Sequence, residues 1–177
     1  MPTIVLTLPT KETVRAFHAT NSEGVAAAYF NGKRMGFNGA RSKEQYESQI
    51  PTLQAALVNE INLSGMTFDA VVCAPSKDTD VIPYFRAVLE RLPLRDISKN
   101  LTRKEEKKAS RPETTVDDMI EEFVYTPDGR EPNIRSILIV DESVATGKTI
   151  AAILHHLRAA GLPEDAKIAV AACVKMG

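Results

Sequence analysis

Three apolar runs, each long enough for one strand, constrain the fold of this chain most strongly. They occupy residues 68–74 (FDAVVCA), 136–141 (SILIVD) and 166–176 (AKIAVAACVKM). Near-continuous apolar runs are typical of strands that are covered on both faces. Residues 80–92 and 149–160 lie between or beside these runs, and each predicts a helix with one apolar side. Buried strands that alternate with helices predict an α/β fold: a mostly parallel, twisted sheet with helices on both faces.

Shorter elements are expected around these strands, and each rests on a local signal. Residues 3–8 predict a short strand, and Asn31-Gly32 supplies the tight turn of a hairpin over residues 24–37. The other expected elements are a helix that starts near Ser42 and restarts at Pro51, a short strand over residues 94–101, an exposed and mobile segment over residues 102–115, a short helix capped by Thr114 or Thr115, and a turn at residues 127–129.

Length and composition bound the number of domains and the compartment. The chain has 177 residues, 44% hydrophobic and 25% charged, which fits one soluble domain over residues 1–177. A net charge of −1 provides no general attraction for nucleic acid or a membrane surface. Cys73 and Cys173 lie inside apolar runs, which indicates buried strand residues in a reducing compartment. Residues 1–12 lack the basic start of a secretory signal, so we expect a cytoplasmic protein that binds neither nucleic acid nor membrane.

The segment SILIVDESVATGKTIAAIL, residues 136–154, carries the strongest chemical signal. Two carboxylates, Asp141 and Glu142, end the apolar run, and residues 144–149 lead into a helix. Free backbone N–H groups at a helix start form an anion site, and a loop this short fits a single phosphate monoester. Ionised carboxylates only accept hydrogen bonds, so the acids suit hydroxyl groups. A ribose 5-phosphate satisfies both halves, with its diol on the acids and its phosphate on the loop.

This segment also allows other interpretations. Gly147, Lys148 and Thr149 match the end of a triphosphate-binding P-loop, in which the lysine would contact phosphate. That motif requires a glycine where Glu142 stands, and a carboxylate there would repel a triphosphate. A further alternative is a loop of a Rossmann-like fold whose sequence matches a phosphate-binding signature only by chance.

The residues ILIVDESVATGKTI resemble the signature of the type I phosphoribosyltransferases, which bind phosphoribosyl pyrophosphate (PRPP). Its constrained positions are met by Asp141, Glu142, Ala145, Thr146, Gly147 and Thr149. The layout is most similar to that of the competence protein F-like group. In that comparison AAYFNGKRMGF matches an early Tyr-x-Gly segment, VVCAPSKD a pyrophosphate loop, and residues 101–118 a flexible basic loop.

The resemblance implies a reaction. A nitrogenous acceptor, for example a nucleobase, would displace pyrophosphate from PRPP in a Mg²⁺-assisted step. The Mg²⁺ would be held mostly by substrate oxygens and water, with Asp141 considered as a protein ligand. An alternative is a non-catalytic regulatory protein of the same fold that binds PRPP or a nucleotide. The small-molecule partners are then PRPP and an acceptor, and a homodimer is compatible with the pairing often seen in the family.

The resemblance also implies roles for residues and regions. The catalytic set is Asp141, Glu142, Lys77 and Arg103. The PRPP-binding set is Asp141, Glu142, Ser143, Val144, Ala145, Thr146, Gly147, Lys148, Thr149, Pro75, Ser76, Lys77, Arg103 and Lys104. Lys148 occupies a variable motif position, so a solvated side chain is an alternative. Residues 1–61 are expected to form a small N-terminal hood over the acceptor, and residues 66–177 the PRPP-binding core.

Overall fold

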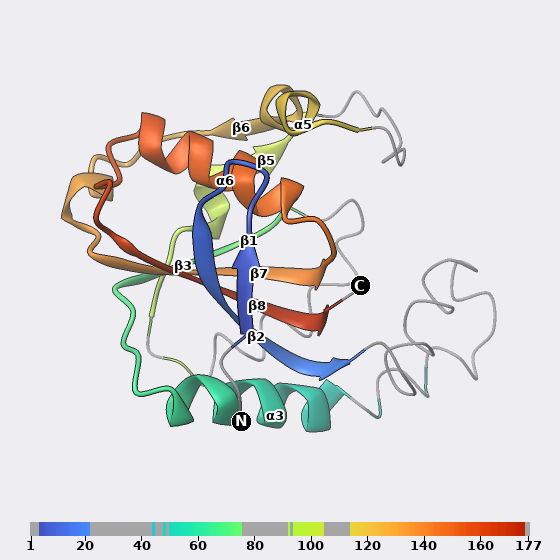
Figure 1. Cartoon of the computed structure of the whole chain (residues 1–177). Helices are drawn as coiled ribbons and strands as arrows, with labels where there is room; N and C mark the ends of the chain where they lie inside the picture. Colours follow the sequence, from blue (N-terminus) through green and yellow to red (C-terminus); the bar gives the residue numbers. More distant parts are fainter. Residues whose placement is uncertain are drawn as a thin grey trace.

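A six-stranded sheet forms the centre of the molecule. The computed structural model describes residues 4–21, 44, 48, 50–75, 92, 94–104 and 114–175. Its main sheet has the order β1-β2-β8-β7-β3-β4, and every neighbouring pair is parallel except β1 with β2 (Figure 1). The strands are β1 (Ile4–Thr7), β2 (Thr13–Asn21), β3 (Ala70–Cys73), β4 (Arg95–Asp96), β7 (Ser136–Val144) and β8 (Lys167–Lys175). The prediction of a mostly parallel sheet is confirmed.

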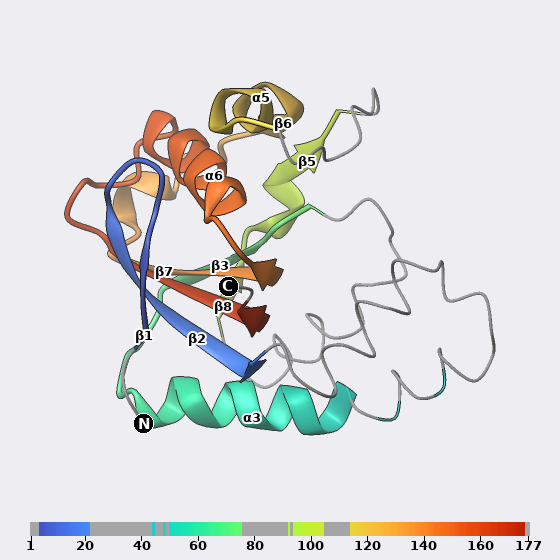
Figure 2. The ribbon, with the colours of Figure 1, turned by 45° about the vertical axis from the view of Figure 1, so that its right-hand side comes forward.

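Helices cover both faces of this sheet. Helix α6 (Lys148–Ala159) lies on one face with α5 (Val116–Glu122), and α3 (Ile50–Leu63) lies on the opposite face (Figures 1 and 2). Beside α5 a second sheet pairs two short antiparallel strands. The smaller elements are β5 (Leu101–Arg103), β6 (Phe123–Tyr125) and the single 3-10 turns η2 (Ser98–Asn100) and η3 (Glu131–Asn133). Helices on both faces are therefore confirmed as well.

The sheet separates two hydrophobic clusters because successive strand side chains point to opposite faces. In β7, Ile137 and Ile139 belong to the cluster under α6, whereas Leu138 and Val140 belong to the cluster that α3 covers. All four side chains are fully buried. This explains why the sequence of this strand is apolar without alternation, as the run 136–141 predicted.

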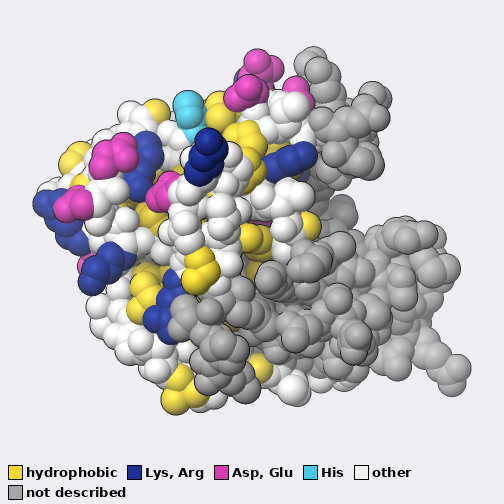
Figure 3. All heavy atoms as spheres, in the orientation of Figure 1, with side chains coloured by type: hydrophobic (Ala, Val, Ile, Leu, Met, Phe, Trp, Pro, Cys, Tyr) yellow, Lys and Arg dark blue, Asp and Glu magenta, His cyan; other side chains and the backbone are white. Residues whose placement is uncertain are grey.

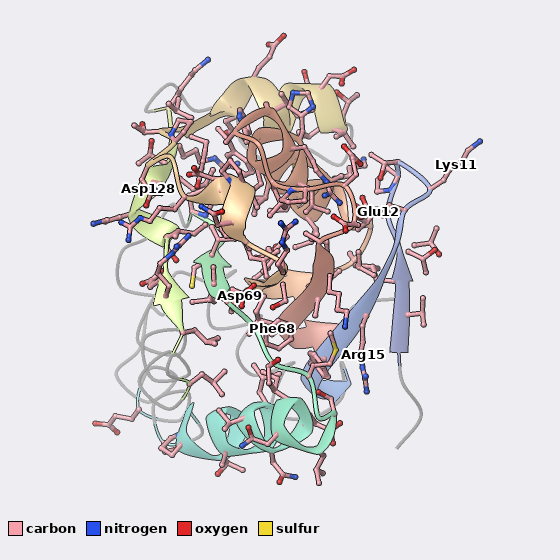
Figure 4. The ribbon with its side chains drawn as sticks, turned by 90° about the vertical axis from the view of Figure 1, so that its left-hand side faces the viewer. Lys11, Glu12, Arg15, Phe68, Asp69 and Asp128 are labelled. Atoms are coloured by element: carbon pink, nitrogen blue, oxygen red, sulfur yellow. The ribbon has the colours of Figure 1, made fainter. Side chains whose placement is uncertain are left out.

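Side chains at the amino ends of the strands fix the pairing of β3 with β7. The carboxylate of Asp69, just before β3, accepts the N–H groups of Arg135 at 2.7 Å and Ser136 at 3.0 Å (Figure 4). The Ser136 hydroxyl in turn accepts the N–H of Asp69 at 3.1 Å. These bonds hold the amino ends of β3 and β7 together. They thereby set the position of the carboxyl end of β3 relative to that of β7.

Three predicted elements differ from the structure. The strand predicted to end at Asp141 continues to Val144, because β8 runs beside it and pairs with it as far as Lys175. The strand predicted over residues 94–101 is only the two-residue β4, followed by η2. The exposed, mobile segment predicted over residues 102–115 is wrong at its start, because Arg103 belongs to β5 and is half-buried.

The short helix near residue 116 is confirmed in detail. Thr115 is its N-cap, and its hydroxyl accepts the N–H of Asp118, whose carboxylate accepts the Thr115 N–H in return.

Figure 3 shows positive and negative side chains interspersed over the described part of one face of the molecule. Within the described residues no helix is long and apolar enough to cross a bilayer.

The predicted hood divides into two parts. Strands β1 and β2 of the region 1–61 join the main sheet, and α3 packs against it, so these elements belong to the body of the domain. The hairpin predicted over residues 24–37 lies outside the described residues, and so does the helix predicted over residues 80–92 except for Leu92, which is a bend residue. A hood therefore remains a prediction for residues 22–49.

Candidate active site

The carboxyl ends of β3 and β7 lie side by side. Cys73, the last residue of β3, pairs in register with Val140 of β7, and the Ala74 N–H donates to the Val140 carbonyl at 2.8 Å. Asp141 is the next residue along β7 and is partly exposed. In parallel sheets ligands bind outside the carboxyl ends of strands. The fold therefore brings Asp141 to the edge from which Pro75 and the predicted pyrophosphate segment leave β3.

A loop of three residues, Ala145 to Gly147, joins β7 to α6 at this edge (Figure 2). Ala145 and Thr146 are exposed, and Gly147 is buried. Gly147 has φ +72°, which L side chains rarely adopt. A Cβ at this position would also lie 2.9 Å from Cδ2 of Leu8, which follows β1. Two independent constraints thus require glycine at the turn into α6.

The start of α6 is suited to an anion. Gly147 is the N-cap and provides no side-chain cap for the first-turn N–H groups, and no acidic residue stands in that turn. Unsatisfied N–H groups and the helix dipole at such a position favour negative charge. The exposed Thr146 adjoins this position, and the Thr149 hydroxyl approaches the sulfur of Met119 on α5 at 3.7 Å. The loop can hold one phosphate group at the same sheet edge as Asp141.

Lys148 does not point freely into solvent. Its half-buried ammonium donates to the Thr114 carbonyl at 2.9 Å, just before the N-cap of α5. The P-loop interpretation requires a longer loop around several phosphates and a lysine that contacts them. The three-residue loop and the bond to Thr114 both argue against it. The alternative of a solvated Lys148 side chain is wrong.

A comparison with protein-family models finds that residues 43–175 match the phosphoribosyl transferase domain. The chain belongs to the phosphoribosyl transferase family. A comparison with curated proteins finds no significant match. The match covers both β7 with its loop and the end of β3, so the family assignment includes the elements that form this edge.

Arg103 has structural partners in this phosphoribosyl transferase domain. Its guanidinium forms an ion pair with Glu122 at the end of α5 and stands 5.6 Å from the ring centre of Phe123. The side chain of Lys104 is exposed, while its backbone N–H donates to the Glu122 carbonyl at 2.9 Å. Arg103 therefore ties β5 to the end of α5, and a catalytic role requires it to act beside Glu122.

The remaining predicted residues are placed only in part. Glu142 and Ser143 continue the backbone of β7, and Val144 is buried at its end. Ser76 and Lys77 lie outside the described residues. The side-chain roles predicted for these residues stay predictions.

A Mg²⁺ ion carried by the substrate fits this edge. Among the residues that the structure describes, no group of three or more His, Cys, Asp or Glu side chains could enclose a metal. Asp141 is a partly exposed carboxylate, and carboxylate oxygen is the ligand type that Mg²⁺ prefers. Mg²⁺ in proteins is usually coordinated by one or two carboxylates together with substrate oxygens and water, and one carboxylate at this edge matches that pattern.

Sequence reasoning missed two polar residues that belong to the same edge. Asp96 ends β4, and Ser98 follows it in η2; the Ser98 hydroxyl accepts the N–H of Cys73 at 2.8 Å. Burial raises the pKa of the Cys73 thiol to about 11; a separate side-chain hydrogen bond between the thiol and Ser98 lowers this pKa, and the charges of Asp96 and Asp141 raise it further. An Asp followed two residues later by Ser after a short strand is a known turn signal, but it does not indicate a contact with β3.

Proposed function

We propose that this chain transfers the phosphoribosyl group of PRPP to a nitrogenous acceptor with release of pyrophosphate. The observation that carries the proposal is the adjacency at one sheet edge of Asp141 and the Gly147 turn into α6. A carboxylate for ribose hydroxyls and an uncapped helix start for a phosphate are the two halves that a ribose 5-phosphate needs. Membership of the phosphoribosyl transferase family supports the same reaction type.

In this proposal the ribose is held between the two halves. Asp141 and Glu142 accept hydrogen bonds from the ribose hydroxyls, and the backbone from Ala145 to Thr149 binds the 5-phosphate. The bond from the anomeric carbon to pyrophosphate breaks, and its electron pair leaves with the pyrophosphate. The lone pair of the acceptor nitrogen forms the new bond, after which that nitrogen loses a proton. The carboxylates favour the positive charge that develops on the ring.

The leaving group is assigned to the segment that follows β3. Pro75, Ser76 and Lys77 would contact the pyrophosphate, with Lys77 and Arg103 acting on its charge and Lys104 beside them. Bound Mg²⁺ would neutralise part of the diphosphate charge. The pairing of Cys73 with Val140 supports the part of this proposal that concerns the segment after β3, because it brings the start of that segment beside Asp141.

The test is the double variant Asp141→Asn with Glu142→Gln, assayed for pyrophosphate release from PRPP, Mg²⁺ and a panel of nucleobases and amines. We expect loss of turnover with an unchanged melting temperature. The chain offers a control in Glu164→Gln with Asp165→Asn, a second adjacent acid pair, which is exposed and lies beyond the far end of α6. Full turnover by the double variant at Asp141 and Glu142 would refute the assignment of the diol contact.

A non-catalytic PRPP- or nucleotide-binding regulator is the second candidate. The observation in its favour is that residues 74–80, APSKDTD, contain no glycine where the family usually has one after the turn. A regulator binds PRPP without releasing pyrophosphate for any acceptor in the panel. Calorimetry with PRPP, run beside the turnover assay, separates the two candidates.

The finer expectations also stand as proposals. Residues 22–49 would supply the hood over the acceptor, and the chain would act in the cytoplasm as a member of the competence protein F-like group. A homodimer is also proposed, because members of the family often form dimers. Light scattering of the purified chain tests this.

A further inference from the structure

Strand β4 ends before its neighbour β3 does. It pairs only with Ala70 and Val71, and the last backbone bond between the two segments runs from the Ile97 N–H to the Val71 carbonyl at 2.9 Å. Cys73 lies two residues after Val71, so its N–H also points from β3 toward the side on which β4 lies. A buried backbone N–H needs an acceptor, and β4 no longer provides one there.

A side chain takes the place of the missing strand. The Ser98 hydroxyl oxygen accepts the N–H of Cys73 at 2.8 Å. That hydroxyl donates a hydrogen bond to Oδ1 of Asp96, and Oδ1 also accepts the backbone N–H of Ser98 at 2.8 Å. A hydroxyl that donates its one proton keeps lone pairs for accepting. A bond to a carboxylate is stronger than a neutral one, so Asp96 fixes the direction of the Ser98 hydroxyl.

The end of β3 is thus held from both sides. On the β4 side the Cys73 N–H is bound by Ser98, and on the β7 side the Ala74 N–H is bound by the Val140 carbonyl at 2.8 Å. Val140 immediately precedes Asp141. The two bonds therefore fix where the chain leaves β3 relative to the carboxylate assigned to the ribose.

We propose that Asp96 and Ser98 are positioning residues for the pyrophosphate-binding segment that leaves β3 at Pro75. This rests on the proposed function, because that function assigns residues 75–77 to pyrophosphate. The two residues touch no substrate. They act by holding the Cys73 peptide, and small displacements of a binding segment weaken substrate binding strongly.

The experiment compares Ser98→Ala with Ser98→Thr, which keeps the hydroxyl. For Ser98→Ala we expect the KM for PRPP and the Kd for Mg²⁺-pyrophosphate to rise about tenfold, with kcat changed less than about threefold. The Cys73 amide should exchange with solvent about tenfold faster, followed by NMR. Ser98→Thr should stay near wild type in all four quantities.

The control is Ser64→Ala. The Ser64 hydroxyl also accepts a backbone N–H, from Met66 at 3.0 Å, and donates to the Ile61 carbonyl at 2.6 Å, but it lies at the end of α3. Ser64→Ala should leave the KM for PRPP and the amide exchange rate of Cys73 unchanged. Asp96→Ala, at an exposed position, repeats the test if Ser98→Ala does not fold.

The outcomes separate this proposal from the proposed function. If wild type binds neither PRPP nor Mg²⁺-pyrophosphate, the proposed function is overturned, and with it the role of Asp96 and Ser98 in binding. If wild type binds and Ser98→Ala binds equally well, only the positioning role is overturned. Unchanged amide exchange of Cys73 in Ser98→Ala would overturn the hydrogen bond on which that role depends.

Discussion

Replacing Gly147 with Ala should destabilise the fold through two separate effects. An L residue at φ +72° costs about 1–2 kcal/mol. The added Cβ would also lie 2.9 Å from Cδ2 of Leu8, whose side chain is 2% exposed and therefore has little room to move. Overpacking of this kind costs about 1–3 kcal/mol. We expect a total of about 2–5 kcal/mol, which for a chain of this size lowers the melting temperature by roughly 10 °C.

A matched glycine separates the two effects. Gly65, after α3, has φ +66°, and a Cβ built there meets nothing within 4 Å. Gly65→Ala therefore carries the backbone cost alone, about 1–2 kcal/mol. Urea unfolding of both variants gives the packing cost at Gly147 as their difference. A double-mutant cycle with Leu8→Ala should show that Gly147→Ala costs about 1–3 kcal/mol less once the Leu8 side chain is shortened.

The result that refutes this reasoning is an equal loss of stability for Gly147→Ala and Gly65→Ala. Full additivity with Leu8→Ala would contradict it in the same way. Because the same turn presents the first N–H groups of α6, Gly147→Ala should also weaken PRPP binding, whereas Gly65→Ala should not.

Three further predictions concern other described residues. In a Cys173→Ala background, iodoacetamide should alkylate native Cys73 about a hundredfold more slowly at about pH 8 than the urea-unfolded chain, because burial raises the Cys73 pKa to about 11; equal rates would contradict this. Burial alone would raise the pKa of Glu131, but bonds from the Asp128 N–H and the Tyr125 hydroxyl hold that pKa below its ordinary value. The stability that Glu131 contributes over Glu131→Gln is therefore present above about pH 4.3 and should disappear as pH falls through the lowered pKa, as measured by urea unfolding across pH; a difference that persists in stronger acid would be inconsistent with it. Lys148→Met should lower stability by about 1 kcal/mol by removing its bond to a backbone carbonyl, with little change in the Kd for PRPP, and a large rise in that Kd would place the lysine on the phosphate instead.

Much of the fold was readable along the chain because burial on both faces leaves a local trace. Residues 136–141 and 166–176 were recognisable as strands from their apolar composition; β7 contains the first run, and β8 covers residues 167–175 of the second. Helix α6 begins within one residue of the prediction, and Thr115 caps α5 as one of its two predicted caps. These features depend on neighbours a few residues away, so sequence patterns can identify them.

The extent of β7 could not be predicted in this way. Glu142 and Ser143 look like loop residues, but they remain in the strand because β8 continues beside them. The same holds for Arg103, whose charged neighbours in sequence suggested an exposed loop and whose partner Glu122 is distant along the chain. Strand pairing and ion pairing between distant segments leave no mark in local composition.

The order of residues alone indicated a mostly parallel α/β fold, and it predicted two acids near the end of a strand followed by a short phosphate-binding loop. Folding in three dimensions established what surrounds that loop: Leu8 beneath Gly147, Thr114 on Lys148, and Ser98 on the end of β3. The first group follows from periodicity and turn chemistry within about ten residues. The second depends on which segments pack side by side, and that is settled by burial and backbone hydrogen bonding over the whole domain.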